Sequence, residues 1–364
     1  GCGPDRWRPA SELTLLQSLS RATAPAFRTV THSLLPDRGT SVSSPVRLGG
    51  YVALLVTPAA LLLDAVRALP ALSIGALSVP FGVALAGTVV AQTERQRLAR
   101  TDVTDLERAD AVDALAVTTA AVGTYWLSVA ADLGPVVASA LVGLGVGLAL
   151  PQVDGAAYCG SFVGMISPAV LSSLEGVALA GAVAGIAFVA TTDVFGGFGG
   201  KYGTIALFGC LTTVALVGAD YAAASPIAWD LVPAVVAVAV LGAIATVVGR
   251  THADASAVVA SAAVGLGAGL AFPVFLPTAG PTLAAVAFCA SFVGMSSAER
   301  LETRSQIAGA GLVCGLVYVV VAPALAGAGG KLGTTAFVSC LAVAGGLELP
   351  SVVRSRVGRS LLGR

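Results

Sequence analysis

The chain has 364 residues, of which 56% are hydrophobic and 11% are charged, and its formal net charge is zero. Twenty-seven of the 40 charged residues fall in four stretches, 1–47, 93–110, 299–304 and 348–364. The other 276 positions hold only 13 charges, too few for the surface of a soluble protein. The composition therefore predicts a polytopic integral membrane protein.

The composition also argues against several classes of function. Two histidines, His32 and His252, are too few for haem ligation or a His-rich metal path. The six cysteines show no CxxC spacing and five lie in apolar stretches, which favours buried reduced thiols. We therefore expect no enzyme activity, metal or cofactor, and the balanced charge gives no reason to expect nucleic acid as a partner.

The first 47 residues form a tail with six arginines and no apolar stretch of the signal-peptide kind. The positive-inside rule places this tail in the cytoplasm, and we expect it to be largely irregular. Residues 48–110 are expected to hold two accessory transmembrane helices and a charged cytoplasmic loop. The basic tail at 349–364 is expected on the same side, which gives a multi-pass protein of the cell membrane with both termini inside.

Twelve apolar runs predict an all-α helical bundle of ten to twelve spans. The runs at 155–171 and 282–298 are short and bear glycine or proline, so they either cross the bilayer or form re-entrant segments. The twelve runs lie at 48–66, 71–92, 111–131, 134–151, 155–171, 174–192, 203–219, 230–249, 257–275, 282–298, 306–326 and 332–348.

An internal duplication is the clearest pattern in the chain. Residues 136–151 (VVASALVGLGVGLALP) and 258–273 (VVASAAVGLGAGLAFP) are identical at 13 of 16 positions. After an insertion of eight residues the match resumes, with CGSFVGM at 159–165 against CASFVGM at 289–295. Identities of this length indicate two copies of one unit.

The two copies are repeat A, 111–219, and repeat B, 230–348, with five apolar segments each. If all five cross the bilayer, the second copy enters from the opposite face and the repeats are inverted, a plan common in secondary transporters. If the 155–171 and 282–298 segments are re-entrant, each copy has four crossings and the repeats are parallel, which suits a channel or a parallel-repeat carrier. We expect inverted repeats, with a solute site at their interface.

The chain has two lysines, Lys201 and Lys331, and both occupy the same position of a duplicated GGKxGT motif. The two glycines allow a tight turn with exposed amides, and the threonine can cap the helix that follows. A helix N-terminus beside an ammonium group is a natural anion site, whereas the alternative is a turn whose lysine reaches lipid headgroups. The candidate substrate-binding residues here are Gly199, Gly200, Lys201, Thr204, Gly329, Gly330, Lys331 and Thr334.

The CxSFVGM motif places small residues four positions apart, Gly160 and Gly164 in the first copy, which favours close helix packing. The alternative is that Ser161 and Ser291 line a polar path between the repeats. Both serines are therefore further candidates for substrate binding.

Isolated carboxylates in apolar stretches are candidates for coupling transport to a proton or sodium gradient. The three candidates are Glu175, Asp193 and Asp113. Neither Glu175 nor Asp193 is duplicated, since they align with Ser305 and Pro323. The sequence does not choose among the three.

These patterns predict a transporter or permease for a small solute, for which the lysines favour an anion. The expected partners are the lipid bilayer and a small-molecule or ion solute, and a homo-oligomer is left open. A channel or pore-forming subunit is the first alternative. A membrane accessory protein without transport activity is the second, because few charges are buried in the apolar stretches.

Overall fold

The computed structural model describes residues 44–68, 74–98 and 107–362. All of them belong to the unit Ser41–Arg364, one of the two units into which the chain divides. The predicted irregular tail lies outside the described residues up to position 43, as does the middle of the predicted charged loop, at 99–106.

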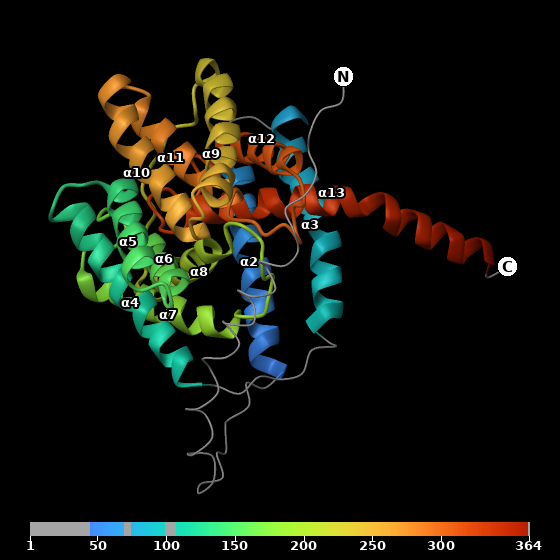
Figure 1. The fold of residues 1–364 in the computed structure, drawn as a ribbon, viewed down its shortest axis with the longest axis horizontal. Helices are drawn as coiled ribbons and strands as arrows, with labels where there is room; N and C mark the ends of the chain where they lie inside the picture. Colours follow the sequence, from blue (N-terminus) through green and yellow to red (C-terminus); the bar gives the residue numbers. More distant parts are fainter. Residues whose placement is uncertain (1–43, 69–73, 99–106, 363–364) are drawn as a thin grey trace, which may run out of the picture. The chain divides into compact units, whose positions relative to one another are not determined.

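The described part of the chain is all-helical, with twelve α-helices, one short 3-10 helix and no strand (Figure 1). It begins with α2 (Ser44–Ala68) and α3 (Ile74–Leu98). The next five helices are α4 (Arg108–Val129), α5 (Pro135–Ala149), α6 (Asp154–Val163), α7 (Leu174–Ala190) and α8 (Lys201–Val217). After the 3-10 turn η1 (Trp229–Leu231) follow α9 (Val232–His252), α10 (Ala257–Phe275), α11 (Gly280–Val293), α12 (Arg304–Val321) and α13 (Lys331–Leu362).

Each of the twelve predicted apolar runs overlaps one of these helices. Two boundaries differ at the predicted tails. Helix α2 already begins at Ser44, inside the predicted tail 1–47, and α13 continues as a helix through most of the predicted tail 349–364.

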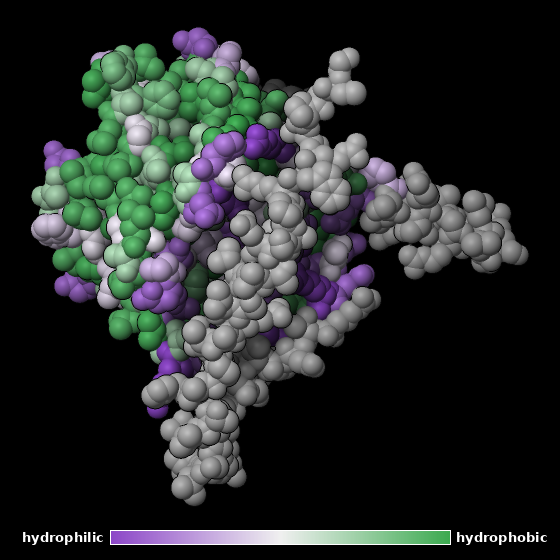
Figure 2. Space-filling view, viewed as in Figure 1, coloured by the Kyte–Doolittle hydropathy of each residue, from purple (hydrophilic) through white to green (hydrophobic). Residues whose placement is uncertain are grey.

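Six helices are long and apolar enough to cross a bilayer: α2, α4, α9 with η1, α10, α12 and the first part of α13. Large apolar side chains such as Leu115, Ile186, Leu241 and Phe275 are exposed on the outside of the helices. Figure 2 shows a broad hydrophobic surface over the region of α5, α9 and α10. The prediction of an all-helical fold is confirmed for the described residues, and the six apolar helices with this surface suit a protein embedded in lipid.

Helices α6 and α11 are too short to cross a bilayer as helices. They have 10 and 14 residues, which is about 15 and 21 Å at the rise of an α-helix, against a hydrocarbon core of about 30 Å. Each continues into an irregular segment, 164–173 after α6 and 294–303 after α11, so only the helix and the irregular segment together are long enough to cross the bilayer.

Helices α4 to α8 and α9 to α13 pack in the same pattern. In the first group α4 and α8 both pack against α6 and α7, and in the second α9 and α13 both pack against α11 and α12. Helices α5 and α10 pack against each other and join the two groups. Helix α2 lies against α7 and α8, and α3 lies against α12 and α13.

Glycines let these helices approach each other closely. Gly160 and Gly164 of α6 lie against Val117 and Ala121 of α4, where an added Cβ atom would overlap backbone carbonyl oxygens. The packing interpretation of the CxSFVGM motif is therefore confirmed for the first copy.

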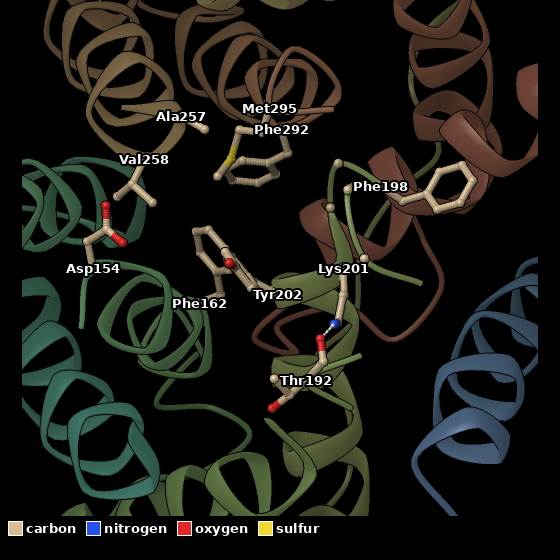
Figure 3. A pocket seen from close by; sticks show the side chains of 14 residues that line it. Asp154, Phe162, Thr192, Phe198, Lys201, Tyr202, Ala257, Val258, Phe292 and Met295 are labelled. Carbon is tan, nitrogen blue, oxygen red and sulfur yellow. Dashed lines mark hydrogen bonds between the residues drawn. The ribbon is translucent and has the colours of Figure 1, made fainter. Parts of the chain in front are cut away.

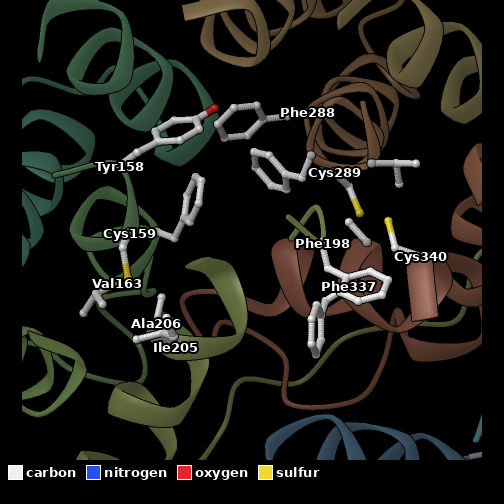
Figure 4. Close-up of a cluster of buried hydrophobic side chains, with 14 of the residues drawn as sticks. Tyr158, Cys159, Val163, Phe198, Ile205, Ala206, Phe288, Cys289, Phe337 and Cys340 are labelled. Carbon is white, nitrogen blue, oxygen red and sulfur yellow. The ribbon is translucent and has the colours of Figure 1, made fainter. Parts of the chain in front are cut away.

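Four aromatic rings of α6 and α11 form the centre of the buried core, part of which Figure 4 shows. Tyr158 and Phe162 of α6 face Phe288 and Phe292 of α11, and the Phe162 and Phe292 ring centroids are 4.7 Å apart. Because all four side chains are buried, the two short helices are fixed to each other at the middle of the fold.

Candidate functional site

Two irregular segments precede the helices that carry the lysines: loop A (192–200), before α8, and loop B (322–330), before α13. They share an unusual backbone. The angle φ is +52° at Phe195 and +44° at Leu325, and it is +82° at Gly200 and +83° at Gly330. Left-handed angles are rare outside glycine, so the packing around Phe195 and Leu325 must hold both loops in this shape.

Each loop is bound to the turn that follows the short helix of the other group. The carbonyl oxygen of Gly197 in loop A accepts a hydrogen bond from the amide of Ser297, at 2.8 Å. The carbonyl oxygen of Gly327 in loop B accepts one from the amide of Ser167, also at 2.8 Å. The two groups therefore exchange equivalent contacts.

The loops lead into α8 and α13, which touch at Gly203 and Gly333. A Cβ atom on either glycine would overlap the Cα atom of the other. Gly199 and Gly329 are equally confined, because a Cβ on Gly199 would overlap the carbonyl oxygen of Phe292 and one on Gly329 would meet the carbonyl oxygens that end α6. The duplicated glycines are thus required by close backbone approach as well as by the turn.

The two lysines of the motif bind the ends of neighbouring helices. Nζ of Lys201 donates to the carbonyl oxygens of Thr191 and Thr192, just beyond the end of α7. Nζ of Lys331 donates to two carbonyl oxygens just beyond α12, at 2.8 and 2.9 Å. The free carbonyls and the negative dipole end of a helix favour a cation there. An ammonium group has three donors, so each lysine keeps one N–H for a further partner.

The prediction that Thr204 and Thr334 cap the helices that follow the glycines is wrong. The Oγ1 atoms of Thr204 and Thr334 donate to the carbonyl oxygens of Gly200 and Gly330, at 3.4 and 3.2 Å, and accept nothing from the first-turn amides. Each threonine lies four residues after the glycine, too far into the helix to cap it. The N-cap of α8 is Gly200, which has no side chain to satisfy those amides.

A cavity of about 450 Å³ lies beside loop A and the start of α8 (Figure 3). The charged side chains that line it are Asp154 and Lys201. Figure 3 shows them on opposite sides, with the ammonium group of Lys201 turned towards Thr192. Asp154 accepts a hydrogen bond from Ser256, at 3.4 Å, and stands at the start of α6.

A second cavity, of about 140 Å³, lies beside loop B and the start of α13. Its walls are built by the corresponding parts of the other group. Several residues of its wall have an equivalent in the wall of the larger cavity. Five of them are Pro135, Val136, Lys331, Leu332 and Met165, and their equivalents, in the same order, are Ala257, Val258, Lys201, Tyr202 and Met295. Asp154 has no acidic counterpart in the smaller cavity, where alanine lines the corresponding wall.

Phe162 and Phe292 line both cavities and form their common wall. Both side chains are almost completely buried, at 2% and 1% exposure, because they pack on each other and on the neighbouring rings. The sequence motif CxSFVGM contains both phenylalanines, yet its composition gave no sign that they would meet.

The candidate serines Ser161 and Ser291 line neither of these two cavities. They are fully buried, and each is hydrogen-bonded to a serine of the adjacent helix, Ser139 and Ser261, at 2.9 and 2.7 Å. Ser261 is also bonded to the hydroxyl of Tyr158, at 2.9 Å. These bonds join helices and leave the serines away from the cavity walls.

The three candidate coupling acids also lie outside the walls of the two cavities. Glu175 is exposed in the first turn of α7, and Asp113 is half-buried in α4. Asp193 forms an ion pair with Arg47 of α2. The acid that lines the larger of these two cavities is Asp154, which was not among the candidates.

Two further carboxylates bind loop amides. Glu94 of α3 accepts from the amide of Phe195 at 2.8 Å, and Asp64 of α2 accepts from the amide of Leu325 at 2.9 Å. Glu94 also pairs with Arg300, at 3.2 Å. Glu94 and Arg300 fall in charged stretches that resemble solvated loops, so sequence alone offered no signal for their burial.

Comparison with protein families, with curated proteins and with solved structures finds no match to this chain.

Proposed function

We propose that the protein is a membrane transporter for a small solute, built from two inverted repeats that alternate access to a central path. The observation that carries this proposal is the pair of cavities, which have equivalent linings and share the wall of Phe162 and Phe292. Two half-paths that meet at one barrier are what alternating access requires. Their different volumes, about 450 and 140 Å³, fit a state in which one half-path is open and the other is closed.

Reciprocal contacts support the two-repeat part of the proposal. The Gly197–Ser297 bond corresponds to the Gly327–Ser167 bond under the sequence offset of 130. Equivalent residues also meet each other, as Gly203 meets Gly333. An exchange of this kind is the signature of a twofold relation between the halves.

The packing of α5 against α10 supports inversion. Gly147, near the end of α5, lies against Val259, near the start of α10, and Gly269 of α10 lies against Val137 of α5. The two helices are therefore antiparallel. A twofold axis that relates antiparallel neighbours runs across them, and for helices that cross a bilayer such an axis lies in the membrane plane.

Basic residues favour a cytoplasmic position for the larger cavity in the proposed arrangement. Arg250 and His252 end helix α9, and Ala257 of the cavity follows them at the start of α10. Under the positive-inside rule this end faces the cytoplasm, together with both termini.

The proposed solute carries an anionic group, as the two lysines predicted. Lys201 lines the larger cavity, keeps one unused N–H, and stands at the uncapped N-terminus of α8. Asp154, on the opposite wall, repels a second negative charge. An anionic group would therefore bind at the Lys201 end of the cavity, with the rest of the solute towards Asp154.

Conductance across planar bilayers in potassium chloride tests the proposal against both alternatives. We expect no conductance from the wild-type protein, because Phe162 and Phe292 close the path between the cavities. Replacing both rings (Phe162→Ala with Phe292→Ala) joins the cavities and should produce a leak. Each single variant retains one ring and serves as a more stable control, since a buried Phe→Ala change costs about 3–5 kcal/mol.

The remaining outcomes separate the three classes of function. Conductance by the wild-type protein would make it a channel. Folded single and double variants that never conduct would favour an accessory protein. Uptake into proteoliposomes of labelled phosphate, sulfate, nitrate or acetate, saturable with concentration, would then identify the solute class.

A further inference from the structure

Loop A is held by a buried charged cluster. Glu94 accepts from the amide of Phe195 with one carboxylate oxygen and from Arg300 with the other, at 2.8 and 3.2 Å. Nε of Arg300 donates to the carbonyl oxygen of Gly196, at 2.8 Å, and its guanidinium carbon lies 4.5 Å from the ring centre of Phe198. Arg300 therefore binds loop A at two points and ties it to α3.

Loop B has only half of this arrangement. Asp64 binds the amide of Leu325 just as Glu94 binds the amide of Phe195. The residue at the position of Arg300 under the offset of 130 is Val170. A Cβ on Gly327 would lie 2.9 Å from Cγ2 of Val170, and a Cβ on Gly197 would lie 3.3 Å from Cγ of Arg300, so the two side chains occupy equivalent places.

The loop that has the arginine borders the larger cavity, and the loop that lacks it borders the smaller one. Loop A, with the arginine, borders the cavity of about 450 Å³, and loop B, with the valine, borders the cavity of about 140 Å³. The glycines and phenylalanine that Arg300 contacts at 196–198 are themselves part of the larger cavity's wall. The position of this wall thus depends on the cluster.

We propose that Arg300 and Glu94 are positioning residues that hold loop A away from its cavity and so set which half-path is open at rest. This inference rests on the proposed alternating transporter. In the exchanged state loop A would close on its cavity and loop B would withdraw. Contacts made in only one of two states shift the population towards that state, and the arginine has no counterpart on the other side to balance it.

Cysteine labelling of both cavities tests the inference without any transported solute. Ala257→Cys reports on the larger cavity and Ala285→Cys on the smaller one. The five native cysteines among the described residues are buried, and only Cys2, outside them, is replaced by serine. The rate of reaction with N-ethylmaleimide is measured at each position in purified, detergent-solubilised protein.

We expect Arg300→Val, which copies the residue of loop B, to slow labelling at position 257 and to speed it at position 285. Loss of a charge-assisted hydrogen bond corresponds to a change of about tenfold or more in the ratio of the two rates. Glu94→Gln should shift the ratio in the same direction. Arg300→Lys keeps the charge but cannot reach both Glu94 and the carbonyl of Gly196, so it should restore part of the ratio.

The reverse substitution, Val170→Arg, offers the pairing with Asp64 that loop B lacks and should favour labelling at position 285. Faster labelling at both positions in Arg300→Val and Glu94→Gln would mean that the cluster only stabilises the fold, and would overturn the inference. An unchanged ratio in all of the variants would overturn it as well. If the labelling rates at positions 257 and 285 change in opposite directions but the protein neither conducts nor transports, the two states would stand and the proposed function would fall.

Discussion

Single glycines in α5 and α10 show how finely the packing depends on one missing side chain. A Cβ on Gly143 would meet the ring of Tyr158, and one on Gly265 would overlap the ring of Phe288. Two residues along the same helices, Gly145 and Gly267 have nothing within 4 Å of an added Cβ. The chain therefore supplies a matched pair of packed and open glycines in each helix.

We predict that Gly143→Ala and Gly265→Ala lower the melting temperature of the purified protein, because overpacking a tight contact costs about 1–3 kcal/mol. Gly145→Ala and Gly267→Ala should leave it unchanged or raise it, since alanine stabilises a helix relative to glycine by up to about 1 kcal/mol. Thermal unfolding in detergent measures both effects. Equal melting temperatures for all four variants would show that these helix faces are not packed.

The sequence was sufficient for one part of this contact and not for the other. The spacing of Gly143 and Gly147, one helical turn apart, is typical of a closely packed helix face, and both glycines do lie against other side chains. The packing partners of these glycines could not be predicted. Tyr158, which contacts Gly143, lies on the next helix, α6, and Val259, which contacts Gly147, lies on α10 in the other group of helices. The periodicity of a sequence indicates which face of a helix is packed, but it does not indicate which other helix packs against that face.

At the scale of elements, the proposed function depends on short helices and on the residues at their ends. The apolar run 155–171 was expected either to cross the bilayer or to form a re-entrant segment, and in the structure α6 ends at Val163 and an irregular segment follows. Gly164 packs against α4 and Ser167 bonds to loop B, so tertiary contacts end the helix where composition alone would continue it. The lysines, too, act between elements, because each binds the end of one helix from the start of the next.

We predict that Lys201→Gln and Lys331→Gln lower the melting temperature, since each removes a charged donor from the carbonyls beyond α7 or α12. A hydrogen bond to a charged group contributes about 1.5–3 kcal/mol. If Lys201 also binds the solute's anionic group, its glutamine variant should raise the half-saturating concentration for anion uptake by about ten- to a hundredfold.

Arginine at either position is the matched control, because it keeps the charge but not the compact shape of the ammonium group. Lower stability with unchanged anion uptake in both glutamine variants would remove the anionic part of the proposal. Wild-type stability in both would instead contradict the role of the lysines at the helix ends.

At the scale of the whole molecule, α2 and α3, which lie outside the two repeats, also occupy equivalent places. Helices α2 and α3 were predicted as accessory helices, yet α2 packs on α7 and α8 as α3 packs on α12 and α13. Asp64 and Glu94 bind corresponding loop amides. Neither relation could be predicted, because α2 and α3 precede repeat A, which begins at 111, and burial of a charge depends on partners that are distant in the sequence. The charge pair of Glu94 and Arg300 is the clearest case.

Inverted repeats are the central claim, and Ala131 and Ala253 test it most directly. These exposed alanines occupy equivalent positions after α4 and α9, each followed by an aspartate with positive φ. Cysteine at each position, with Cys2 replaced by serine, is treated in intact cells with a membrane-impermeant maleimide. We predict labelling of Ala131→Cys from outside and labelling of Ala253→Cys only after the membrane is opened. Labelling of both positions from the same side would contradict inversion and require parallel repeats.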